Sequence, residues 1–154
     1  VLVEEYLPGR EFTAGILGNG FNARSAGIIE IILLDNAEKN VYSFANKEQC
    51  EQLVEYRFAE DAIAKKAVDV ALRAWQVLGC LDAGRVDLKC DSNGNPQFLE
   101  VNPLAGLHPS HSDLPIICTK AGISYPSLIA NIMYNALTRY NLLDSAPEKL
   151  YSSI

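Results

Sequence analysis

The dipeptide Asn93-Gly94 restricts the fold of this chain more than any other feature, because it lies between two β-rich runs, Leu81–Cys90 and Pro96–Asn102. Asn-Gly is favoured in two-residue hairpin turns, where both central residues take positive φ. The sequence therefore predicts an antiparallel hairpin with Asn93-Gly94 at its turn.

A two-residue turn would also determine which residues face each other across this hairpin. It would place Asp87 opposite Glu100 and Arg85 opposite Asn102, and the alternation of side chains would put all four on one face of the sheet. A three-residue loop would shift the register by one residue and move Glu100 to the other face.

The predicted pair of opposed carboxylates needs a partner, since two carboxylates directly opposite each other repel. Asp87, Glu100 and the amide oxygen of Asn102 form an oxygen ligand set of the kind that Mg²⁺ prefers. The alternative is a solvated polar face in which Arg85 balances the charge of Asp87. The residues themselves leave both interpretations open.

Two segments outside the hairpin have the periodicity of amphipathic helices, Asp61–Leu78 and Ser124–Tyr140. Gly79 follows the first as a stop signal, and Ser124 can cap the second. We predict an α+β fold with a mixed, largely antiparallel sheet and helices packed on one side. Three more runs are predicted as strands: Val1–Tyr6, Phe12–Leu17 and Ala26–Leu34. Val41–Phe44 is predicted as a short strand or the start of a loop, and Ala45–Phe58 as irregular.

Composition places limits on the partners of this chain. Its 154 residues suit one domain, and its formal net charge of −6 does not favour a nucleic-acid partner. The longest apolar run, Ala26–Leu34, is far shorter than the roughly 20 residues that cross a bilayer, so no membrane partner is predicted. The cysteines show no CxxC spacing, which favours a reducing cytoplasm over disulfides or structural zinc: Cys50, Cys80, Cys90 and Cys118.

The hairpin strands belong to a longer pattern of four segments that keep a fixed order. Taken together, they resemble the D-alanine–D-alanine ligases of the ATP-grasp superfamily. The resemblance implies an ATP-grasp C-terminal lobe over residues 1–143, truncated at its N-terminus, and a flexible tail over residues 144–154. The segments are Glu4–Phe12 (EEYLPGREF), Gly84–Asp87 (GRVD), Phe98–Leu107 (FLEVNPLAGL) and Ala121–Tyr125 (AGISY).

The resemblance implies ATP as a cofactor and a set of residues that contact it. Glu4, with the backbone of Tyr6 and Leu7, would contact adenine, and Glu11 would bind the ribose hydroxyls. Lys47 matches a lysine of the family's mobile loop, which closes over the phosphates.

The resemblance also implies two Mg²⁺ ions, with Mn²⁺ as a possible substitute, and an acyl phosphate intermediate. Asp87 and Asn102 would each bind one ion, and Glu100 would bridge both. Arg85 would stabilise charge on the transferring phosphate, where a guanidinium is most useful, and the amide of Gly106 would face the developing oxyanion. The implied reaction joins two amino acids, with D-alanyl-D-alanine synthesis for the cell wall as the leading assignment.

Three departures from the family pattern concern the amino-acid pockets. Pro103–Gly106 (PLAG) replaces the family's Thr-Ser-Pro-Gly, and Glu48 stands where the mobile loop often has tyrosine. The serine that holds the second substrate's carboxylate could be Ser110 or Ser112. Two alternatives therefore stay open: a ligase for another amino acid or peptide, or a non-catalytic nucleotide-binding or assembly module.

ATP-grasp enzymes hold ATP between two lobes, and the small lobe and an N-terminal domain are expected before Val1. The chain alone is therefore predicted to show no ligase turnover. Its first strands would then form an exposed sheet edge, which makes a homodimer a further hypothesis.

Overall fold

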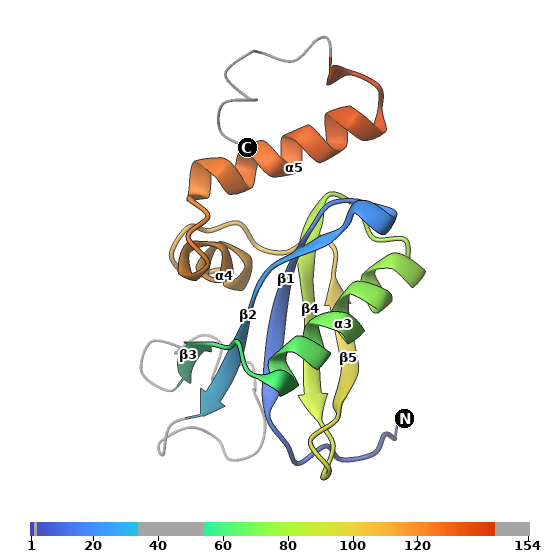
Figure 1. Ribbon diagram of the computed structural model, residues 1–154, viewed down its shortest axis with the longest axis vertical. Coiled ribbons are helices and arrows are strands. Elements are labelled where there is room, and N and C mark those ends of the chain that lie inside the picture. Colours follow the sequence, from blue (N-terminus) through green and yellow to red (C-terminus); the bar gives the residue numbers. More distant parts are fainter. Residues whose placement is uncertain (2, 34–53, 144–154) are drawn as a thin grey trace.

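The computed structural model describes residues 1, 3–33 and 54–143 (Figure 1). Its centre is a five-stranded sheet in the order β3-β2-β1-β4-β5. Each neighbouring pair of these strands is antiparallel, so the described part of the sheet is not mixed. The strands are β1 (Glu11–Leu17), β2 (Arg24–Leu33), β3 (Val54–Phe58), β4 (Ala83–Cys90) and β5 (Pro96–Asn102).

Within the described residues, three α-helices and one 3₁₀ turn accompany the sheet, and the two predicted helices are confirmed to within a residue at each end. The Asp61 carboxylate accepts the N–H groups of Ile63 (2.8 Å) and Ala64 (3.0 Å) at the start of α3. Gly79 takes φ 67° just beyond its end. The elements are η1 (Gly20–Asn22), α3 (Ala62–Val77), α4 (Asp113–Lys120) and α5 (Tyr125–Arg139), of which α4 was not predicted.

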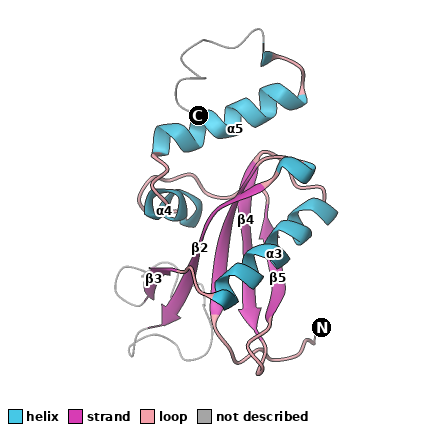
Figure 2. Cartoon of the chain, viewed as in Figure 1, coloured by secondary structure: helices cyan, strands magenta, loops and turns pink. Residues whose placement is uncertain are grey.

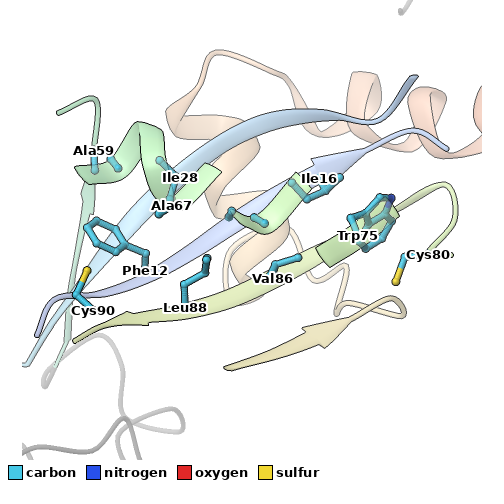
Figure 3. Close-up of a cluster of buried hydrophobic side chains, with 13 residues drawn as sticks. Phe12, Ile16, Ile28, Ala59, Ala67, Trp75, Cys80, Val86, Leu88 and Cys90 are labelled. Carbon is cyan, nitrogen blue, oxygen red and sulfur yellow. The ribbon is translucent and has the colours of Figure 1, made fainter. Parts of the chain in front are cut away.

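Helix α3 packs on one face of the sheet and forms the main hydrophobic core with it (Figure 3). Alanines at helical spacing on α3 let the helix lie close to the strands. Trp75 is fully buried, and its indole N–H donates to the Gly18 carbonyl at 3.0 Å. The core includes Phe12, Ala14, Ile16, Val86, Leu88, Ala64, Ala67, Ala71 and Trp75.

Helix α4 packs on the opposite face, where glycine on β1 makes room for it. A Cβ on Gly15 would lie 3.1 Å from both Leu114 and Ile117 of α4. Gly15 follows Ala14 of the α3 core, and successive strand residues point to opposite faces. The prediction of helices on one side is therefore wrong. Figure 2 shows α5 beyond α4, past one end of the sheet.

The hairpin of β4 and β5 has the predicted pairs but a different turn. Cys90 pairs with Pro96, so residues 91–95 form the loop instead of a two-residue turn. The register is therefore shifted by one near the loop, and a bulge at Leu99 shifts it back. Asp87 then lies opposite Glu100 and Arg85 opposite Asn102, as predicted.

Two other strand predictions are wrong. Val1 and Val3–Tyr6 do not form a strand, and the irregular segment predicted up to Phe58 contains strand β3. Strand β1 lies between β2 and β4, so the described sheet has its edges at β3 and β5. The edge argument for a homodimer, which placed the exposed edge at the first strands, therefore does not hold. The predictions for Val41–Phe44, for Lys47 and for a tail from Asp144 lie outside the described residues.

Candidate functional site

The face of the sheet opposite α3 carries the four predicted hairpin residues within one hydrogen-bonded group. Asn102 Nδ2 donates to Asp87 Oδ2 (3.3 Å) and to Glu100 Oε1 (3.2 Å). Arg85 Nη2 lies 3.4 Å from Asp87 Oδ2. Asp87 and Arg85 are mostly buried, with 14% and 17% of their side chains exposed. The four side chains therefore lie together on one face, as the predicted pairing required.

Thr13 is a member of this group that the sequence did not reveal. It is 1% exposed, lies opposite Asp87 on the neighbouring strand, and its hydroxyl donates to Asp87 Oδ1 at 2.9 Å. A hydrogen bond to a charged acceptor helps to offset the desolvation of that carboxylate. No sequence signal pointed to Thr13, because its role depends on β1 pairing with β4.

Glu11 lies further along the same face and has a cationic neighbour. Lys89 Nζ donates to Glu11 Oε2 at 2.9 Å, and the two residues are directly paired across β1 and β4. Both side chains are 16% exposed. The carboxylate of Glu11 is therefore held in place by a partner that was also missed in the sequence.

A cleft of about 730 Å³ joins these groups to the segment before β1. All of the predicted adenine and ribose contacts line it, together with two of the predicted metal ligands. Phe98 and Leu99, at the bulge in β5, are 41% and 44% exposed, and both residues line this cleft. Its lining includes Glu4, Tyr6, Leu7, Glu11, Asp87, Lys89, Phe98, Leu99 and Glu100.

A smaller pocket of about 180 Å³ is lined by Arg85. A Cβ on Gly106 would lie 2.6 Å from Ser112 Oγ, so the chain passes very close to that serine. Ser112 Oγ accepts the His108 N–H at 3.0 Å, whereas Ser110 Oγ lies 3.4 Å from His108 Nδ1. Of the two candidate serines, Ser112 lines the pocket, with Arg85, Gly106, His111, Asp113 and Tyr56.

Arg85 has two acidic partners. One is Asp87, and the other is Asp113 at the start of α4, whose carboxylate pairs with Arg85 Nη1. The Nε–H of Arg85 is buried and has no acceptor within the described residues. A buried donor of this kind is normally satisfied by an ordered water or a ligand.

The comparisons with known proteins agree on one family. A family model described as "D-ala D-ala ligase C-terminus" matches residues 1–134. The chain belongs to the D-alanine–D-alanine ligase family. The part of the family that it represents is the C-terminal region.

Individual relatives of this ligase region give the same result. The D-alanine–D-alanine ligases of Bordetella petrii and Gluconobacter oxydans are 34% and 35% identical over 138 and 139 residues. These matches cover 88% and 90% of the chain but 41% and 44% of the relatives. The chain thus spans about two fifths of the length of the ligases it matches.

Solved structures show the same ligase fold. The D-alanine–D-alanine ligase of Bacillus anthracis, complexed with ATP, has a TM-score of 0.67 and 26% identity over 88% of this chain and 40% of its own. VanG, a D-Ala:D-Ser ligase of Enterococcus faecalis, shares the fold, with a TM-score of 0.63 and 24% identity over 86% of this chain and 37% of its own. The predicted ATP-grasp C-terminal lobe is confirmed.

The hairpin of this ligase region offers oxygen atoms of the kind that bind a divalent cation, provided that the amide of Asn102 turns over. The described residues contain no cluster of three His, Cys, Asp or Glu side chains suited to a metal ion. The predicted set has two carboxylates, Asp87 and Glu100, and the Asn102 amide. Asn102 presents its NH₂ group to both carboxylates, so its oxygen would bind an ion only after the amide turns over.

Within residues 1, 3–33 and 54–143, no helix has both the length and the apolar character to cross a bilayer.

Proposed function

We propose that this chain is the nucleotide- and cation-binding lobe of an ATP-dependent carboxylate–amine ligase that joins two amino acids through an acyl phosphate. One observation carries the proposal. Asp87 and Glu100, which share a face of the sheet with Arg85 and Asn102, line a cleft that the predicted adenine and ribose contacts also line. Membership of the D-alanine–D-alanine ligase family supports D-alanine as the leading substrate.

On the nucleotide side, Glu4 and the backbone of Tyr6 and Leu7 would contact the adenine, and Glu11 would bind the ribose hydroxyls. The Lys89 ammonium, 2.9 Å from Glu11, would keep that carboxylate oriented toward the cleft. The proposed closure of Lys47 over the phosphates lies outside the described residues and remains a prediction.

On the reacting side, Asp87, Glu100 and Asn102 would hold Mg²⁺ or Mn²⁺, with two ions expected from the family resemblance. When bound, the cations supply positive charge against the phosphate oxygens as charge develops there. Arg85 would add a guanidinium to the same phosphoryl group. The Gly106 N–H would donate to the oxyanion that forms when the amine attacks the acyl phosphate.

The smaller pocket is the proposed site of the amino-acid substrate. We assign the carboxylate-binding role to Ser112 in preference to Ser110, because Ser112 lines the pocket with Arg85 and Gly106. The identity of the second amino acid is tied to this pocket, where the chain departs from the family pattern at Pro103–Gly106. A ligase for another amino acid or a peptide is therefore the second candidate.

The complete ligase site would need more than this lobe, since the chain spans about two fifths of its relatives. The remaining part would supply the second wall of the nucleotide site and a surface for the first substrate. We propose that the intact ligase acts in the cytoplasm, where ATP and its amino-acid substrates are found.

The test is calorimetric titration with a non-hydrolysable ATP analogue, with and without Mg²⁺, on the chain and on the intact ligase that contains it. Asp87→Asn/Glu100→Gln should weaken Mg²⁺-dependent binding by at least about tenfold, the lower limit even for residues that only support a metal site. The control, Asp69→Asn/Glu55→Gln, makes the same charge change at exposed positions on α3 and β3.

Binding that needs no Mg²⁺, or that is equal in both double variants, would contradict the proposed metal site. Nucleotide binding without any amino-acid turnover by the intact protein would favour a non-catalytic module instead.

A further inference from the structure

Asp113 is a buried acid that the proposed reaction does not use. It is the first residue of α4, and 8% of its side chain is exposed. Its carboxylate pairs with Arg85 Nη1, while Arg85 Nη2 lies 3.4 Å from Asp87. A buried carboxylate is costly unless a cation and hydrogen bonds offset its desolvation. The guanidinium of Arg85 is therefore shared between two acids on different elements.

The position of Asp113 is set by the packing of α4 on the sheet. Two other residues of the helix, Leu114 and Ile117, are 1% and 0% exposed. Both pack against Gly15 of β1, where a Cβ would lie 3.1 Å from each of them. Asp113 is thus carried by a packed helix and not by a loop. It gives the Arg85 side chain a fixed anchor at the wall of the smaller pocket.

Because Arg85 pairs with two acids, it neutralises Asp87 less than a single close pair would. A guanidinium facing a single carboxylate prefers two parallel hydrogen bonds to it, which occupy both of the carboxylate oxygens. Such a pair between Arg85 and Asp87 would compete with a cation for the same oxygens. Asp113 takes up Nη1, and the remaining contact to Asp87 is long at 3.4 Å.

We propose that Asp113 is a positioning residue that holds Arg85 away from a close, two-point pair with Asp87 and so favours cation binding at the hairpin. This inference rests on the proposed function. One guanidinium between two carboxylates leaves the group with a formal charge of −1, before Glu100 adds a second negative charge. A purely structural role would be the stabilisation of the α4 N-terminus by a negative charge.

The first experiment needs neither metal nor nucleotide. The Nε–Hε signal of Arg85 is followed by ¹⁵N NMR in the 154-residue chain and assigned by its loss in Arg85→Lys. Asp113→Asn should change its shift and increase its mobility as Arg85 leaves the anchor. Asp82→Asn is the matched control, because it weakens another guanidinium–carboxylate pair, at Arg139 (2.6 Å), and should leave the Arg85 signal unchanged.

The second experiment is a double-mutant cycle on Mn²⁺ affinity, measured by the EPR signal of free Mn²⁺ with a non-hydrolysable ATP analogue present. Asp113→Asn should weaken Mn²⁺ binding by at least about twofold, the lower range for coupled neighbours. In an Arg85→Gln background the same change should have almost no effect, because Asp113 acts through Arg85.

Each outcome decides between the roles. An unchanged Arg85 signal in Asp113→Asn, or an equal loss of Mn²⁺ affinity with and without Arg85, would overturn the positioning role and leave the proposed function standing. If neither the chain nor the intact ligase that contains it binds Mn²⁺, the proposed metal site is removed, while the NMR result still reports whether Asp113 anchors Arg85. Thermal unfolding of each variant, monitored by circular dichroism, verifies that it is folded.

Discussion

The two faces of β1 and β4 are built from alternating residues of the same strands, yet they are organised in opposite ways. On the α3 face, Phe12 and Val86 are fully buried and apolar, and contacts are non-directional. On the cleft face, the adjacent Thr13 is 1% exposed and Asp87 is mostly buried, and the two are held by directed contacts, among them the 2.9 Å hydrogen bond from the Thr13 hydroxyl to Asp87. The comparison separates residues that stabilise the lobe from residues that equip it for binding.

The largest expected effect belongs to the α3 face. Phe12→Ala should lower the free energy of unfolding by about 3–5 kcal/mol, since it removes a fully buried ring and leaves a cavity. Urea unfolding followed by the fluorescence of Trp75 measures the change. A loss below about 1 kcal/mol would mean that the two faces do not differ as described.

One residue further along β1, Thr13→Val keeps the shape of the side chain and removes its hydroxyl. We expect a loss of about 1–2 kcal/mol in the free energy of unfolding, because Asp87 loses a hydrogen bond in a mostly buried position. Cation affinity should fall as well, which the Mn²⁺ titration would detect. An increase in the free energy of unfolding would show that the hydrogen bond from the Thr13 hydroxyl does not stabilise the Asp87 carboxylate.

Glu100→Gln should change stability in the opposite direction. Asp87 and Glu100 lie directly across from each other, so removing one charge should raise the free energy of unfolding by about 0.2–1 kcal/mol. The same substitution should weaken cation-dependent nucleotide binding. Denaturation and calorimetry on one preparation test both, and a loss of stability greater than about 1 kcal/mol would contradict the repulsion.

The smallest effect concerns acid stability and lies away from the cleft. Hydrogen bonding from Arg10, followed by the backbone N–H of Ala64, lowers the pKa of Asp61 from 3.8 to about 2. Because the folded-state pKa is lowered, its contribution to stability is present above about pH 4 and is lost as the pH falls toward 2. Asp61→Asn should therefore flatten the pH dependence of stability between pH 4 and pH 2. The difference in stability between the two proteins should be constant above pH 4 and should shrink as the pH falls from 4 to 2, and equal slopes within this window would refute the assignment.

Local sequence patterns were sufficient for the elements that carry their own signals. Helices α3 and α5 have apolar periodicity with Asp61 or Ser124 as caps, and the structure ends them within a residue of the prediction. Helix α4 was missed because it is a short, apolar segment with Pro115 inside its first turn. Its burial also depends on close packing against Gly15, which has no side chain. Strand β3 carries a strand signal of its own, since its sequence VEYRF alternates apolar and charged residues, and the prediction of an irregular segment overlooked it.

The pairing of Asp87 with Glu100 and of Arg85 with Asn102 was predicted correctly from an incorrect turn. The loop of residues 91–95 shifts the pairing by one, and the bulge at Leu99 restores it before Glu100. Side-chain alternation alone determined that Arg85, Asp87, Glu100 and Asn102 could share a face. The bulge could not be predicted from sequence, because it is defined by pairing with the partner strand: Phe98 and Glu100 each pair with a residue of β4, and Leu99 does not.

The sequence by itself determined the family, the two long helices and the acidic hairpin, because these depend on residues close together along the chain and on motifs in a fixed order. Only the tertiary structure decided that Thr13 and Asp113 support the hairpin. The pairing of β1 with β4 brings Thr13 to Asp87, and the packing of α4 brings Asp113 to Arg85. Contacts between distant segments depend on strand order and helix packing, which no local pattern encodes.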